Sequence, residues 1–144
     1  MPEEKKAGSR STVVKKLKAT KTVSVYQKEW FFAMKDRVEK EKCDFAILNA
    51  DVPMEIFRAM DIPFVVNQWW AAICGAKRMT RKYFGLMQEN GYRPDLNSYT
   101  AQALAESFDP DDHKVDADGN PMGPWGGLPK PTICITRLTG DAQN

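Results

Sequence analysis

Cysteine and histidine are scarce in this chain of 144 residues, which has three cysteines and one histidine. Cys43, Cys74 and Cys134 are odd in number and far apart, so they form neither a disulfide framework nor a CxxC metal site. Each stands in an apolar stretch, and we expect all three to be small buried hydrophobic residues. Because the one histidine, His113, lies in an acidic segment, a Cys/His or Ser/His nucleophile system is disfavoured.

Long apolar runs are lacking too. No stretch approaches the roughly 18 residues needed to cross a bilayer, and the Lys-rich N-terminus has no apolar core of the kind that marks a secretory signal. Hydrophobic residues make up 42% of the chain and charged residues 28%, which is ordinary for a soluble globular protein. We therefore expect a cytoplasmic protein with no membrane partner.

The positive charge is concentrated at the N-terminus. Residues 1–21 carry seven basic and two acidic side chains, a net charge of +5, which leaves about −3 for the remainder. Such a segment could contact nucleic acid or an acidic protein surface. It contains no aromatic residue on which bases could stack, which disfavours nucleic-acid binding. We predict a flexible basic tail over residues 1–21.

Residues 22–144 show the hydrophobic patterning of a single α/β domain. Short apolar runs at 45–48 and 64–66 predict buried strands, and residues 131–136 are a third strand candidate. Helical spacing predicts helices over 25–38, 54–60, 69–90 and 98–108, and the polar residues 109–130 predict a long loop. The first helix presents Trp30, Met34 and Val38 on one face, with Phe31 beside them. This order predicts a Rossmann-like open sheet, mostly parallel, with helices on both faces.

Two segments follow predicted strands directly, at the edge of an α/β sheet where ligands usually bind. One is Asn67-Gln68-Trp69-Trp70, whose amides and indoles could form a polar and aromatic wall for an acyl group. The alternative is that the tryptophans pack the helix onto the sheet while Asn67 caps it. The other segment is 48–55, where we expect Asp51 to cap a helix with Pro53 in its first turn. Glu55 there is favoured by the helix dipole without any catalytic role.

The loop over residues 109–130 offers no recognised ligand motif. Its glycines do not lie between a strand and a helix, as a phosphate-binding loop requires. Residues 116–120 are similar to part of a calcium loop, but the twelfth-position glutamate and the flanking helices are missing. We therefore predict a flexible acidic turn at 116–120.

Four motifs in order resemble one family, the 2-hydroxyacyl-CoA dehydratases and benzoyl-CoA reductases. The resemblance covers roughly residues 22–141 and places residues 22–144 with the family's N-terminal domain. It rests on Pro-x-Glu and Ala-x-x-x-Pro within 52–63, Gly-Tyr-x-x-Asp-x-Asn-x-Tyr at 91–99, Asp-Gly-x-Pro-Met at 118–122 and Pro-x-Pro before an apolar strand at 129–135. The resemblance implies anaerobic metabolism: radical dehydration of a 2-hydroxyacyl-CoA, or reduction of an aromatic acyl-CoA, driven by an ATP-dependent electron activator.

The departures from the family pattern concern its iron–sulfur cluster. In cluster-bearing subunits the Tyr-flanked motif supplies one cysteine to a [4Fe–4S] cluster, and a second follows the strand after Pro-x-Pro. This chain has Asn97 at the first position and Asp141 at the second. Amide and carboxylate oxygens are poor substitutes for thiolates. The resemblance therefore implies no cofactor on this chain, with the cluster on a partner subunit.

Two functional hypotheses follow. The first is a non-cluster subunit, accessory or pseudo-catalytic, that assembles with a cluster-bearing paralogous subunit and could line the acyl-CoA site; such a subunit would not be catalytic alone. Its catalytic residues are unknown. The substrate-positioning residues we would expect, acting through hydrogen bonds, are Glu55, Asn67, Gln68, Asn97, Ser98 and Tyr99. The second hypothesis is a structural or scaffolding protein that binds no substrate. Family subunits have a second α/β half, so the chain is expected to be a truncated, split or small accessory subunit.

Overall fold

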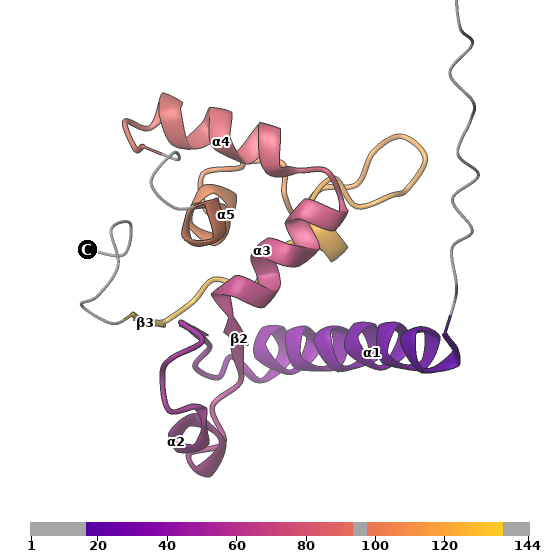
Figure 1. Ribbon diagram of the computed structural model, residues 1–144, viewed down its shortest axis with the longest axis vertical. Helices are drawn as coiled ribbons and strands as arrows, with labels where there is room; N and C mark the ends of the chain where they lie inside the picture. Colours follow the sequence, from indigo (N-terminus) through magenta and orange to yellow (C-terminus); the bar gives the residue numbers. More distant parts are fainter. Residues whose placement is uncertain (1–16, 94–97, 137–144) are drawn as a thin grey trace, which may run out of the picture. The chain divides into compact units, whose positions relative to one another are not determined.

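The computed structural model describes residues 17–93 and 98–136, with the backbone alone for 98–101. The chain divides into two compact units, Met1–Ala33 and Met34–Asn144, and the sheet belongs to the second unit. The elements in chain order (Figure 1) are α1 Lys18–Glu41, β1 Ala46–Leu48, α2 Met54–Ala59, β2 Phe64–Val66, α3 Asn67–Ala76, α4 Thr80–Glu89, α5 Ser98–Glu106, the 3-10 turn η1 Pro124–Gly126, and β3 Ile133–Ile135.

The three apolar runs form one parallel sheet in the order β2-β1-β3. Ala46 of β1 pairs with Phe64 of β2 and with Ile133 of β3. This confirms the α/β character and the parallel strands that the element order predicted. The third strand candidate is confirmed as β3, but Cys134 and Ile135 are exposed, so the expectation that Cys134 is buried was wrong. β2 is also an edge strand, but its Val65 is fully buried, so the exposure of β3 does not come from its edge position alone.

Helix α2 covers one face of the sheet. Phe57 of α2 packs with Ala46 and Leu48 of β1, and its ring meets that of Phe64 edge-on, with the centroids 6.1 Å apart. The N-cap position of α2 is Pro53, not Asp51 as predicted. Proline at a helix start loses no hydrogen bond, because the first N–H groups of a helix have no intrahelical partner. The finer Rossmann-like arrangement, with helices on both faces, stays a prediction.

The prediction of a single long helix over 69–90 was wrong, because this segment forms two helices, α3 and α4. The break has Arg78 in the left-handed region, at φ 60°. The N–H of Met79 donates to the carbonyl of Cys74 at 3.0 Å, and that of Arg78 donates to Gly75 at 3.0 Å. This is the Schellman termination, which satisfies the last carbonyls of a helix and turns the chain. It uses an arginine where glycine is usual, so no glycine or proline marks this helix end.

Helix α1 begins at Lys18, so the last residues of the predicted tail, 18–21, are helical, and residues 1–16 lie outside the described part. Its buried side chains are Phe31, Met34 and Val38. Trp30 is 38% exposed, so the prediction that it shares the buried face was wrong. The buried three are spaced i, i+3 and i+7, which keeps them on one stripe of a 3.6-residue helix.

The predicted loop over 109–130 is folded back on itself. Val115 and Pro121 form an antiparallel bridge. Between them, the carboxylate of Asp116 accepts the backbone N–H groups of Asp118 and Asn120 at 2.9 and 2.8 Å. These bonds hold the pKa of Asp116 below its usual value and close the acidic turn on itself.

Candidate functional site

A pair of side-chain amides lies at the carboxyl ends of β1 and β2. The side-chain oxygen of Gln68, in the first turn of α3, accepts the backbone N–H of Ala50 at 3.0 Å. The nitrogen of the same amide donates to Oδ1 of Asn49. Asn49 is buried, and its backbone N–H donates to the carbonyl of Ile135 at 3.0 Å. We call Asn49 and Gln68 the edge amides; they join the ends of all three strands.

The six predicted positioning residues are described to different extents. Asn67 and Gln68 stand together at the start of α3, which follows β2 without a loop (Figure 1). Glu55 lies in the first turn of α2 and is exposed. Ser98 and Tyr99 begin α5, where the backbone alone is described, and Asn97 lies outside the described residues. Of the six, only the consecutive residues Asn67 and Gln68 are described next to each other. Substrate binding by any of the six stays a prediction.

Two details of the segment at 67–70 differ from what the sequence suggested. Asn67 does not cap α3: Val66 occupies the N-cap, and Asn67 is the first helical residue. The indoles of Trp69 and Trp70 lie 6.0 Å apart by their centroids, and that of Trp125 lies 5.8 and 6.4 Å from them. The tryptophans of α3 therefore contact Trp125 of η1, whereas the packing alternative expected them to pack the helix onto the sheet. Trp125 was not singled out, although its Gly-Pro-Trp-Gly-Gly setting marks a tight turn.

Two carboxyl groups are buried together among α3, α4 and α5. Oε1 of Glu106 accepts the backbone N–H of Leu128, and Oε2 accepts the indole N–H of Trp70. Asp112 is 1% exposed, and its Oδ1 accepts the hydroxyl of Tyr83 at 2.7 Å. No donor within the described residues reaches Asp112 Oδ2. The neighbouring Glu106 can supply one, but only when it is protonated.

The surroundings favour the protonated form of Glu106. Burial raises the pKa of Glu106 to about 9, and the adjacent Asp112 carboxylate adds to that shift. The two N–H groups that Glu106 accepts act in the opposite direction and are outweighed. At neutral pH Glu106 therefore keeps its proton. Burial also raises the pKa of the Cys74 thiol and of the Tyr83 hydroxyl, so both stay neutral.

Two glycines hold the turn at 123–128 against this carboxyl pair. A Cβ on Gly123 would lie 2.0 Å from Oδ1 of Asp112, and one on Gly127 would lie 2.1 Å from Oδ2. The ammonium of Lys35 donates to the carbonyl oxygens of Gly126 and Gly127, the second at 2.9 Å. The carboxyl pair is thus enclosed on every side, and its chemistry serves the fold. No spacing in the sequence pointed to Glu106 or Asp112, because the turn that unites them is set by tertiary contacts.

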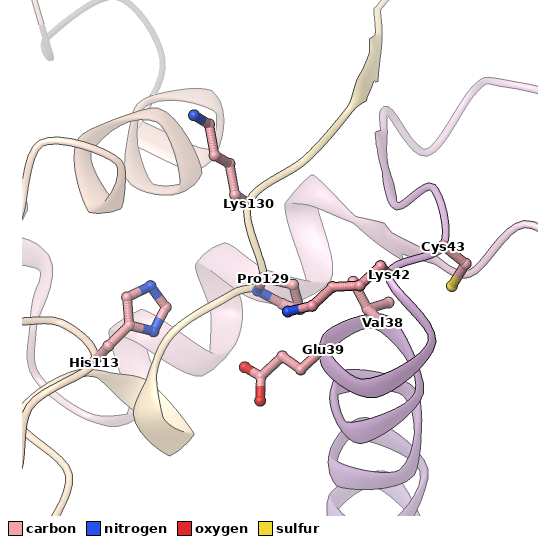
Figure 2. Close-up of a pocket in the computed structure, with 7 residues that line it drawn as sticks. All are labelled: Val38, Glu39, Lys42, Cys43, His113, Pro129 and Lys130. Atoms are coloured by element: carbon pink, nitrogen blue, oxygen red, sulfur yellow. The ribbon is translucent and has the colours of Figure 1, made fainter.

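A pocket of about 390 Å³ opens to solvent beside the end of α1. Val38 and Pro129 form its apolar part, and polar side chains form the rest (Figure 2). Figure 2 shows Lys42 and Glu39 directed into the space beside Pro129, with His113 across from them and Lys130 and Cys43 extending away. The complete lining is Val38, Glu39, Lys42, Cys43, His113, Pro129 and Lys130.

The cysteines are not placed as ligands of one cluster. Cys74 is buried in α3, Cys43 is half-buried after α1, and Cys134 is exposed on β3. The expectation of three buried cysteines was therefore correct for Cys74 alone. Within residues 17–93 and 98–136, no three Cys, His, Asp or Glu side chains gather as a metal site. Asn97 and Asp141 lie outside the described residues, so the loss of the cluster stays a prediction.

A comparison of the chain with protein-family models, curated proteins and solved structures finds no match. Among the described residues, none of the helices has the length and apolar character that a membrane span requires.

Proposed function

We propose that this chain is a non-cluster subunit of an acyl-CoA-processing complex, in which the edge amides position the acyl group. The single observation that carries the proposal is the convergence of Asn49 and Gln68 at the carboxyl edge of a parallel sheet. That edge is where open α/β sheets usually bind ligands. The family resemblance supplies the substrate class, and a cluster-bearing partner subunit would supply the electron chemistry.

The existing hydrogen bonds of Gln68 leave room for a ligand. A side-chain amide has two N–H donors and two acceptor lone pairs. Gln68 gives one donor to Asn49 and takes one donor from Ala50, which leaves one donor and one lone pair. The remaining donor suits the thioester carbonyl of an acyl-CoA, and the remaining lone pair suits a 2-hydroxyl group. In this role the chain orients the substrate and transfers no proton or electron itself.

The test is calorimetric titration of the full chain with a short 2-hydroxyacyl-CoA and with benzoyl-CoA. We expect one of them to bind and Gln68→Leu to weaken binding by on the order of tenfold, as loss of one well-placed hydrogen bond does. Gln88→Leu, an exposed glutamine on α4, is the matched control and should leave binding unchanged. Equal affinity for the wild type and Gln68→Leu would remove the edge amides from the proposal.

One observation favours a second candidate, a scaffolding protein that binds no substrate. The edge amides already tie β1, β3 and α3 together, which accounts for both residues structurally. Under this alternative neither acyl-CoA binds, and Gln68→Leu lowers stability alone. Purification from the native source adds a second readout. A brown iron–sulfur partner that co-purifies supports the acyl-CoA complex. A colourless stable monomer that binds no acyl-CoA contradicts that complex and shows no scaffolding partner either.

A further inference from the structure

The pocket beside the end of α1 carries positive charge that its own surroundings do not neutralise. Neither Lys42 nor Lys130 forms an ion pair with a described residue. Glu39 is the one acidic side chain in the lining, and Lys35 lies 3.8 Å from its carboxylate. Since Lys35 offsets Glu39, the charge of Lys42 remains in the pocket, and Lys130 lines the pocket with its side chain extending away from it (Figure 2). A lysine charge beside an apolar wall, with a second lysine in the lining, favours an organic anion.

The neighbouring contacts fix this pocket in place. Lys42 ends α1 in the left-handed conformation, at φ 56°, and its N–H donates to the carbonyl of Val38 at 3.1 Å. On the far side, Nδ1 of His113 lies 3.0 Å from the carbonyl oxygen of Gly126, which Lys35 also contacts. Lys35 thus links α1 to the turn at 123–128, and His113 contacts the same turn. These contacts hold the two sides of the pocket in place.

We propose that this pocket binds the phosphate groups of a small organic anion. Its volume lies within the range of small-molecule sites, about 300–1,000 Å³, and lysine ammonium groups are common point-charge partners of phosphate. The identification of the anion rests on the proposed function: in an acyl-CoA subunit, the anion is the nucleotide part of coenzyme A. The edge amides would then serve the acyl end and this pocket the phosphate end.

The test uses calorimetric titration of the full chain with coenzyme A, adenosine 3′,5′-bisphosphate, inorganic pyrophosphate and phosphate-free pantetheine. We expect the three phosphate compounds to bind and pantetheine to bind at least about tenfold more weakly. Combined Lys42→Gln and Lys130→Gln should weaken the phosphate compounds by on the order of tenfold or more. Lys40→Gln is the control, because Lys40 pairs with Asp36 and does not line the pocket.

A third variant separates charge from damage to the fold. Glu39→Gln removes the one negative charge of the pocket, so it should tighten phosphate binding by about two- to fivefold and more so at low salt. A misfolded variant cannot bind more tightly. Unchanged affinity in the double lysine variant, or weaker binding in Glu39→Gln, would overturn the proposal.

The outcomes also separate this pocket from the proposed function. Binding of pyrophosphate and the bisphosphate, sensitive to the lysine variants, without binding of any acyl-CoA keeps the pocket and refutes the acyl-CoA role. Binding of an acyl-CoA that depends on Gln68 but not on Lys42 and Lys130 keeps the acyl-CoA role and refutes the pocket. No binding of any phosphate compound refutes the pocket outright.

Discussion

The buried Glu106–Asp112 pair predicts that the folded state loses stability as the pH rises from about 5 to 9. The pKa of Glu106 is about 9 in the folded chain, against an ordinary value of 4.5. Between these values the folded state holds a proton that the unfolded state has released. The stabilisation is therefore complete below about pH 4.5 and is lost progressively as the pH approaches 9.

The size of the effect follows from proton linkage. One proton bound by the folded state alone changes the free energy of unfolding by about 1.4 kcal/mol per pH unit. Moving from pH 5 to pH 7 should therefore lower it by on the order of 3 kcal/mol, a large share of a typical stability of about 5–15 kcal/mol. The carboxyl groups whose pKa is lowered, those of Asp61, Asp111 and Asp116, act below pH 4 and with the opposite sign. The window from pH 5 to 8 thus isolates Glu106, because the raised pKa values of Cys74 and Tyr83 change the stability only at higher pH.

Urea unfolding at pH 5, 6, 7 and 8 measures the slope, with tryptophan fluorescence as the signal because Trp70 donates to Glu106. Glu106→Gln should cost about 1–3 kcal/mol at pH 5, since the amide nitrogen cannot accept the N–H of Trp70 or Leu128. It should also remove the pH dependence, so that the variant becomes the more stable protein at high pH. The control is Glu89→Gln, an exposed glutamate on α4. A flat wild-type profile, or an equal slope in Glu106→Gln, would refute the reasoning.

Two further predictions concern the turn at 123–128 and the cysteines. Gly127→Ala places a Cβ 2.1 Å from Asp112 at φ 77° and should lower the free energy of unfolding by about 2–4 kcal/mol. Gly85→Ala, whose Cβ would meet nothing within 4 Å, should raise the free energy of unfolding by about 0.5–1 kcal/mol. Equal effects of the two substitutions in urea titrations would contradict this packing. In thiol titration with a chromogenic disulfide, Cys134 should react in the native protein and Cys74 only after unfolding, so rapid native reaction of Cys74 would contradict its burial.

The parts of the fold that the sequence predicted are those set by local pattern. The apolar runs at 45–48 and 64–66 could be recognised as strands because the central strand β1 and its neighbour β2 are covered by other parts of the chain. Since Gln68 follows the second run directly, its position at a strand end could be predicted as well. The break at Arg78 was missed because its helix end relies on hydrogen bonds from Met79 and Arg78 rather than on glycine or proline. Glu106 and Asp112 were missed because their pairing depends on a turn more than ten residues further along the chain.

Buried and partly exposed polar side chains in this chain can serve different roles, stability in the first case and ligand binding in the second. The carboxyl pair and Tyr83 are buried, so their hydrogen bonds stabilise the fold and offer nothing to a ligand. The edge amides are different, because Gln68 is half-buried and retains hydrogen-bonding capacity beyond its two structural contacts. A residue held in place by its own fold loses little conformational freedom when a ligand binds, and this lowers the entropic cost of binding. The structural contacts of Gln68 therefore favour a positioning role rather than argue against one.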